Sequence, residues 1–247
     1  ASWSVLGSGD PGALTGLDIA AIWEQTETYV LNASYPTTGV EAIDATLRAM
    51  AEQAVAAFKE EVAALPAPAS DGNTRIPYEF NLSYRVYRHS QALVSFKFES
   101  MTDILPDAPS VEVRTRTFDL ERGIELQLSQ LFRDTGAYLG TLSQLCREQL
   151  GQCDLPQDAV NQSLLLRGTA ALPENYARFA LGQEGLILFF SAGQVASKDY
   201  GDFQVLLPYD HLGDAFLPGP AEPLPTAQAQ PVTAAGQPTA QAPAAEA

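Results

Sequence analysis

The chain has 247 residues, of which 30 are acidic and 14 basic, so its formal net charge is -16 and its sequence pI is about 4.3. Hydrophobic residues make up 46% of the chain, enough for the core of one large domain or two small ones. The acidity argues against a nucleic-acid-binding surface, which is built mainly from Lys and Arg. No apolar run approaches the roughly 20 residues that span a bilayer.

Residues 1–19 are predicted to form an N-terminal linker, because this stretch is rich in Gly and Ser. Its run from Gly7 to Gly12 matches the G-x-G-x-x-G nucleotide fingerprint in its letters. A dinucleotide site also needs a strand before the glycines and a helix after them, and neither is expected here. Ala1 to Ala20 lacks the basic and apolar regions of a signal peptide, which fits a cytosolic protein or one whose signal or lipid anchor was removed.

Residues 20–110 predict an N-terminal α+β subdomain with a long helix and a meander. Trp23 to Ser34 has the Thr, Tyr and Val content of a strand. A helix is expected next, with Thr37 or Thr38 as its cap and Glu41 as the capping-box partner. Its apolar residues recur at helical spacing: Val40, Ile43, Leu47, Met50, Ala54, Phe58, Val62 and Leu65.

Alternating apolar and polar residues after this helix predict an antiparallel meander with one buried and one polar face. The residues expected on the buried face of the first two strands are Tyr78, Phe80, Leu82, Tyr84, Val86, Val94, Phe96 and Phe98. A third strand is expected over about Val111 to Leu120. Arg85, Lys97 and Arg114 could form a basic strip on the open face, but interleaved acidic residues favour cross-strand ion pairs instead.

Residues 111–216 predict a C-terminal subdomain. Helical patterns cover Thr135 to Leu150 and Gln157 to Leu166. Short strands are expected at Phe179 to Leu181, Leu186 to Phe190 and Phe203 to Leu207. The element order indicates an α+β fold, in which a long helix packs on an antiparallel meander and further helices and short strands follow.

Residues 217–247 are predicted to be a disordered tail, because they are rich in Ala, Pro and Gln and contain no Lys, Arg or aromatic residue. The tail holds two acidic residues, so the rest of the chain still carries a charge of -14. A surface of this charge favours a cationic partner through electrostatic steering. Solubility alone is the alternative explanation of the charge.

Few residues are available for catalysis or metal binding. The chain has two histidines, His89 and His211, and no Cys-x-x-Cys or His-x-x-x-His spacing that would indicate a zinc site. Asp210 precedes His211 as an orienting carboxylate would, but no nucleophile elbow accompanies the pair. We therefore expect no catalytic residue, no metal and no cofactor.

The two cysteines, Cys146 and Cys153, leave two alternatives open. In one continuous helix they would lie about 10 Å apart along the axis, which is too far for a disulfide. A bridge becomes feasible if the helix ends at Gly151 and the chain folds back. Two reduced thiols are the other alternative.

Three stretches of the chain resemble one bacterial family. They are Phe118 to Leu126 with Leu131-Phe132; Pro173 to Tyr176 with Phe179 and Gly185-Leu186; and Gln194 to Ala196 with Gly201, Val205 to Tyr209 and Leu212. These stretches are similar to the domain of unknown function shared by the lysozyme-sensing anti-sigma factor RsiV and the peptidoglycan deacetylase PdaC. With a companion domain before it, the resemblance covers roughly Ala20 to Phe216.

This resemblance implies a non-enzymatic binding domain in the periplasm or elsewhere in the bacterial envelope, because a separate domain of the deacetylase carries its chemistry. Lysozyme or another cationic protein is the partner that it implies. Two loops are expected to contact this partner, with their acidic residues steering it and one tyrosine supplying buried area. The expected contact residues are Asp103, Asp107, Ser197, Lys198, Asp199 and Tyr200. The alternative is a module that binds peptidoglycan or another glycan, with Tyr78, Tyr87 or Tyr200 stacked on sugar rings.

Overall fold

A computed structural model describes residues 3–4, 17–66, 68, 70–71, 74–75, 77–104, 109–152, 162–219 and 221, with the backbone alone at 3–4, 70–71 and 74–75. Several sequence predictions concern residues outside this set. They are most of the linker at 1–19 with its glycine-rich run, Asp107, Cys153, the start of the helix predicted over 157–166, and most of the tail at 217–247. Within the described residues, no helix is both long and apolar enough to cross a membrane.

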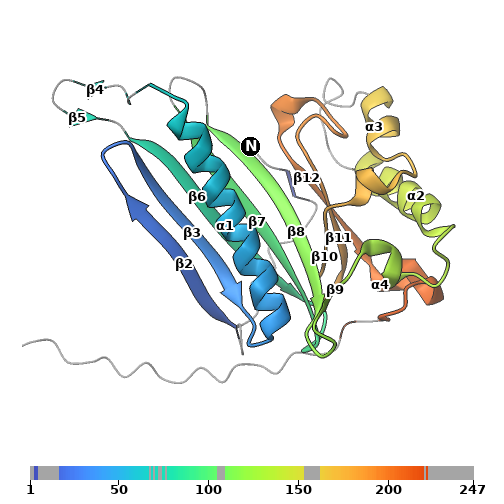
Figure 1. Ribbon diagram of the computed structural model, residues 1–247. Coiled ribbons are helices and arrows are strands. Elements are labelled where there is room, and N and C mark those ends of the chain that lie inside the picture. Colours follow the sequence, from blue (N-terminus) through green and yellow to red (C-terminus); the bar gives the residue numbers. More distant parts are fainter. Residues whose placement is uncertain are drawn as a thin grey trace, which may run out of the picture.

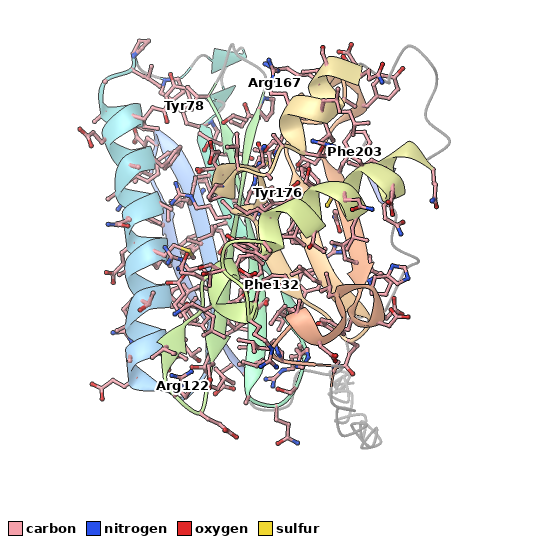
Figure 2. All side chains as sticks on the ribbon, turned by 90° about the vertical axis from the view of Figure 1, so that its right-hand side faces the viewer. Tyr78, Arg122, Phe132, Arg167, Tyr176 and Phe203 are labelled. Atoms are coloured by element: carbon pink, nitrogen blue, oxygen red, sulfur yellow. The ribbon has the colours of Figure 1, made fainter. Side chains whose placement is uncertain are left out.

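The chain folds into four layers, in the order helix, sheet, sheet and helices (Figure 1). Helix α1 (Glu41–Ala63) covers one face of a six-stranded sheet, and a four-stranded sheet packs on the other side. Figure 2 shows the same layers from the side, with the C-terminal helices outermost. The mixed α+β class predicted from the sequence is confirmed.

The six-stranded sheet has the order β2-β3-β6-β7-β8-β9, and all its neighbouring strands are antiparallel except β3 and β6. Its strands are Asp18–Gln25, Tyr29–Thr37, Tyr78–Arg88, Leu93–Asp103, Ser110–Asp119 and Ile124–Glu125. The other sheet has the order β1-β12-β11-β10, with strands Trp3–Ser4, Phe203–Pro208, Gly185–Phe190 and Phe179–Leu181. A separate ribbon pairs β4 (Ser70–Asp71) with β5 (Thr74–Arg75).

The remaining elements follow the six-stranded sheet in the chain. The helices are α2 (Tyr138–Gly151), α3 (Gln162–Gly168) and α4 (Tyr209–Leu212). The 3-10 turns are η1 (Leu128–Leu131), η2 (Pro173–Tyr176), η3 (Lys198–Tyr200) and η4 (Gly213–Ala215). These elements enclose an apolar core against the four-stranded sheet, whereas α1 encloses a second core against the six-stranded sheet. Strand β8 continues the sheet begun by β6 and β7, and the division into subdomains at residue 110 stays a prediction.

The single strand expected over Trp23 to Ser34 is wrong, because the chain forms the hairpin of β2 and β3 there. The hydroxyl of Thr26 accepts hydrogen bonds from the backbone amides of Thr28 and Tyr29, at 3.1 and 3.0 Å. A threonine hydroxyl bonded to the backbone two or three residues later stabilises a turn. Strand propensity on both sides hid this turn in the sequence.

The start of α1 also differs from the expected capping box. Asp44, rather than Glu41, organises this end of the helix. Its carboxylate accepts hydrogen bonds from the backbone amide and hydroxyl of Thr38, at 2.6 and 2.8 Å, and from the amide of Gly39 at 3.1 Å. The buried face of the helix contains Ile43, Leu47, Met50, Ala51, Val55, Phe58 and Val62.

The basic strip, which was the less favoured alternative in the sequence, does not form, because Arg114 lies on the opposite face of the sheet from Arg85 and Lys97. Lys97 lies opposite Arg85 in the register, on the face away from α1, whereas Arg114 lies opposite Phe98 on the face toward α1. A shift of one residue along a strand changes the face on which a side chain lies. Lys97 instead pairs with Glu99 of its own strand, at 2.5 Å.

Candidate binding groove

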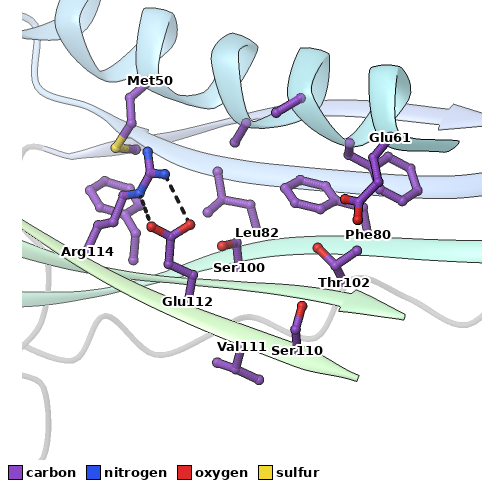
Figure 3. Close-up of a pocket in the computed structure, with 14 residues that line it drawn as sticks. Met50, Glu61, Phe80, Leu82, Ser100, Thr102, Ser110, Val111, Glu112 and Arg114 are labelled. Atoms are coloured by element: carbon purple, nitrogen blue, oxygen red, sulfur yellow. Dashed lines mark hydrogen bonds and ion pairs between the residues drawn. The ribbon is translucent and has the colours of Figure 1, made fainter. Parts of the chain in front are cut away.

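A groove lies between α1 and the strands β7 and β8 (Figure 3). It encloses about 280 Å³. Its apolar lining residues are Met50, Ala54, Ala57, Phe58, Phe80, Leu82, Phe98 and Val111. Its polar lining residues are Glu61, Ser100, Thr102, Ser110, Glu112 and Arg114.

The groove exists because the helix-facing side of the sheet changes from apolar to polar. On β7 the helix-facing positions are Phe96 and Phe98 and then Ser100 and Thr102. Polar side chains are costly to bury without hydrogen-bond partners. Helix α1 packs mainly on β3 and β6, so it leaves this corner of the sheet open.

One ion pair lies in the groove. Arg114 donates from Nε and Nη2 to the two carboxylate oxygens of Glu112, at 2.8 and 3.1 Å. Both side chains are more than half exposed, so the pair adds at most about 1 kcal/mol to stability. Its consequence for the groove is that the one basic group of the lining is already neutralised.

The other polar side chains of the groove have no hydrogen-bond partner among the described residues. Glu61 is exposed, and Figure 3 shows its carboxylate directed from α1 toward Thr102 on the facing strand. Within the part of the chain that the structure describes, neither this carboxylate nor the hydroxyls of Ser100, Thr102 and Ser110 have a hydrogen-bond partner. Hydroxyls on the opposite face of the same strands are bonded, as in the pair of Ser95 and Thr117 at 2.8 Å. The groove therefore presents free hydrogen-bonding groups above an apolar floor.

The two loops predicted to contact a partner belong to different sheets. Asp103 ends β7, next to Thr102 but on the other face of the sheet. Its Oδ1 atom is buried and has no hydrogen-bond partner among the described residues. The predicted contact by Asp103 stays a prediction.

The second predicted loop, Ser197 to Tyr200, forms the turn η3 between β11 and β12. The hydroxyl of Ser197 donates to Asp199 at 3.3 Å, and the aliphatic part of Lys198 packs over Gly193. The ring of Tyr200 packs against the C-terminal core, which reduces the area that it can offer a partner. Phe203 follows this turn in the chain, and Tyr78 lies beside Glu79, which pairs with Asp103 in the sheet. Figure 2 shows Phe203 and Tyr78 toward the same end of the molecule, so both predicted loops lie toward that end.

The tyrosines expected to stack on sugar rings are largely occupied by the fold. Tyr78 is 4% exposed, and its hydroxyl donates to the carbonyl oxygen of Pro66 at 3.0 Å, so the prediction is wrong for this residue. Tyr87 is half-buried against Phe189, with 6.0 Å between the ring centroids. The side chain of Trp23 on β2, by contrast, is 66% exposed.

The histidines and cysteine of the described residues do not form a reactive cluster. His89 is buried, with Nε2 at 3.1 Å from the carbonyl oxygen of Gly219, and His211 is exposed. No group of three or more His, Cys, Asp or Glu within the described ranges could hold a metal ion. Cys146 is a buried thiol without a disulfide partner among the described residues, and burial raises its pKa to about 12. The bridge to Cys153 stays a prediction.

The fold and the groove define the chain as an α+β protein with a small, open groove. Residues 129–210 match the family described as "Protein of unknown function (DUF3298)". The family resemblance predicted from the sequence is thereby confirmed. The groove is formed by residues that precede the matched segment.

A curated relative supports the same relationship. The chain is 24% identical over 198 residues, 80% of its length, to the peptidoglycan-N-acetylmuramic acid deacetylase PdaC of Bacillus subtilis (strain 168). The alignment spans 41% of that protein, so the chain corresponds to less than half of this relative.

Two crystal structures share the fold. A DUF3298 family protein from Pseudomonas aeruginosa PAO1 superposes with a TM-score of 0.60 at 16% identity, covering 86% of this chain and 99% of that one. A member of the family from Bacteroides fragilis NCTC 9343 gives a TM-score of 0.52 at 13% identity, covering 84% and 95%. Both cover most of this chain, so the fold similarity extends well beyond the matched family segment.

Proposed function

We propose that this chain is a non-enzymatic binding domain of the bacterial cell envelope and that its partner is a cationic protein such as lysozyme. The observation that carries the proposal is the unpaired acidity of the folded part. Without the tail the charge is -14, because 28 acidic residues stand against 14 basic ones. Even if every Lys and Arg paired with one carboxylate, as in the ion pairs of Glu24, Glu99, Glu112 and Glu125, 14 carboxylates would remain in excess. Such an excess of unpaired carboxylates attracts basic proteins and accelerates their association.

The envelope location is supported by the relative, whose name gives peptidoglycan as its substrate. Peptidoglycan lies outside the cytoplasmic membrane, where lysozyme also acts. A binding role is supported by the polar groups of the groove that have no hydrogen-bond partner among the described residues. The loops at Asp103 and at Ser197 to Tyr200 remain candidate contacts in this proposal.

The test is a titration of the protein with hen lysozyme at low and at moderate ionic strength. Cytochrome c, a basic protein of unrelated fold, serves as the control for unspecific charge attraction. We expect saturable binding of lysozyme that weakens with added salt and is tighter than binding of cytochrome c. Equal binding of the two proteins, or no binding of lysozyme, would contradict the proposal.

One observation favours a glycan-binding module as the second candidate. Trp23 exposes its indole on β2, and Asn32 lies opposite it in the register with an amide bonded to Asn81 at 3.2 Å. Aromatic rings beside amides present one apolar and one hydrogen-bonding surface, as sugar rings require. Sedimentation with purified peptidoglycan tests this candidate, which requires salt-insensitive binding that Trp23→Ala removes.

A further inference from the structure

We propose that the groove between α1 and β8 binds one arginine or lysine side chain of a protein partner, with the cationic group at Glu61. This inference rests on the proposed function, because it takes the partner to be a cationic protein. It adds the place on this chain and the chemical group that is recognised there.

The size of the groove fits a side chain. Pockets for drug-sized ligands usually enclose about 300–1,000 Å³. The groove encloses about 280 Å³ and is partly open to solvent. It therefore has room for one long side chain but is small for several sugar rings.

The lining is complementary to an aliphatic stem that ends in a cation. Phe80, Leu82 and Phe98 form an apolar floor on which methylene groups can pack. Lysine and arginine head groups carry hydrogen-bond donors and no acceptors. The carboxylate of Glu61 and the free hydroxyls of Ser100 and Thr102 can accept hydrogen bonds from them.

The charge of the lining selects a cation over an anion. Glu112 and Arg114 neutralise each other through two hydrogen bonds, so Glu61 leaves the lining with one net negative charge. An anionic ligand would face this carboxylate and would have to break the ion pair to reach Arg114. A single cation matches the remaining charge without any rearrangement.

The first experiment uses small probes on the full chain and does not depend on the identity of the partner. N-acetyl-arginine methylamide is titrated into the labelled protein and followed by amide chemical shifts. N-acetyl-citrulline methylamide, a neutral compound of nearly the same shape, is the control. We expect saturable shifts at Glu61, Ser100 and Thr102 with the arginine compound alone. Equal shifts with both compounds, or none at these residues, would overturn the inference.

The second experiment compares charge variants in lysozyme binding. Glu61→Gln should weaken binding roughly ten-fold, which is typical for the loss of a hydrogen bond to a charged group. Glu60→Gln removes the same charge from the next residue of α1, outside the groove lining, and should change binding much less. If lysozyme binds and the two variants behave alike, the groove is excluded while the proposed function stands. If lysozyme does not bind at all, the proposed function fails, and the arginine probe decides on the groove.

A third comparison fills the groove without changing its charge. Ser100→Leu places an apolar side chain in the space that the stem would take, and lysozyme binding should fall by roughly ten-fold or more. Ser83→Leu makes the same change on the opposite face of the sheet and serves as the control. Unchanged melting temperatures must accompany both variants. Full lysozyme affinity in Ser100→Leu would contradict the inference.

Discussion

The backbone amide of Leu181 donates a hydrogen bond of 2.9 Å to the hydroxyl oxygen of Ser95, and this bond joins the edge of one sheet to the face of the other. Both residues are fully buried. A second bond of the same kind links the amide of Phe179 to the hydroxyl of Thr115 at 3.0 Å. Strand β10 therefore satisfies its free edge with side chains of the larger sheet, where an unpaired edge would otherwise invite aggregation.

Ser95→Ala should lower the free energy of unfolding by about 1–3 kcal/mol, because the buried amide of Leu181 loses its acceptor. The matched control is Ser83→Ala, on an exposed position of the neighbouring strand, which should change stability by less than about 0.5 kcal/mol. Urea unfolding of both variants provides the measurement. Equal effects would show that the bond between the two sheets contributes nothing measurable.

Two glycines should respond to alanine with opposite signs. A Cβ atom at Gly185 would lie 2.2 Å from the carbonyl oxygen of Leu207 on the neighbouring strand, so Gly185→Ala must move the backbone. We expect Gly185→Ala to lower the free energy of unfolding by about 1–3 kcal/mol. A Cβ atom at Gly140, within α2, would meet nothing within 4 Å, and Gly140→Ala should stabilise the protein by about 0.5–1 kcal/mol. Melting temperatures of the two variants measure these effects. A higher melting temperature for Gly185→Ala would contradict the close approach of Gly185 to the backbone of Leu207.

The short strands of the C-terminal sheet could be predicted closely from the sequence. Runs such as Leu186 to Phe190 are apolar throughout and are bounded by turn residues, so local pattern alone identifies them. The turn at Thr26 could not be seen in the same way, because its signal is one hydroxyl among residues that all favour strands.

The groove was missed because it depends on the register between strands and on the path of α1. Sequence alternation shows that Arg114 and Val113 lie on opposite faces, but only pairing with Phe98 shows that Arg114 faces the helix. One local signal was available. On β7 the apolar alternation stops after Phe98, at Ser100 and Thr102, before the strand itself ends.

The buried thiol of Cys146 makes stability depend on alkaline pH. Its pKa is raised by burial from an ordinary value near 9 to about 12. The stabilising effect of the neutral thiol is complete below pH 9, and it is lost as the pH rises toward 12, because the unfolded chain ionises first. Between these two pKa values the free energy of unfolding falls by roughly 1.4 kcal/mol for each pH unit. Urea unfolding measures this effect. Between pH 8 and pH 10 the free energy of unfolding should fall less in Cys146→Ala than in the unchanged protein.

The same thiol gives a test of the predicted bridge. At pH 8 the folded, reduced protein should leave Cys146 unlabelled by a thiol-specific disulfide reagent, because the reactive thiolate is scarce and the side chain is buried. Unfolding should make it reactive. Intact mass before and after reduction then reports whether Cys146 and Cys153 were joined beforehand. Rapid labelling of Cys146 in the folded state would contradict the burial.

The predicted end of the folded body at residue 216 can be tested by truncation. Phe216 is buried, and its ring stacks on Tyr209 at 5.1 Å and contacts Phe132 edge-on at 5.6 Å between centroids. A chain that ends at Ala215 loses this ring and should be destabilised by about 3–5 kcal/mol. A chain that ends at Ala221 keeps it.

An intermediate truncation separates the aromatic ring from the contact that follows it. A chain that ends at Leu217 keeps Phe216 but removes Gly219, whose carbonyl oxygen is the partner of His89 Nε2 at 3.1 Å. Because His89 is buried, we expect a further loss of about 1–3 kcal/mol relative to the chain that ends at Ala221. Thermal melts of the three truncated chains and the full chain are the measurement. If the chain that ends at Leu217 is as stable as the chain that ends at Ala221, the folded body ends at Phe216, as the sequence predicts. If the chain that ends at Leu217 is less stable, the folded body extends to Gly219.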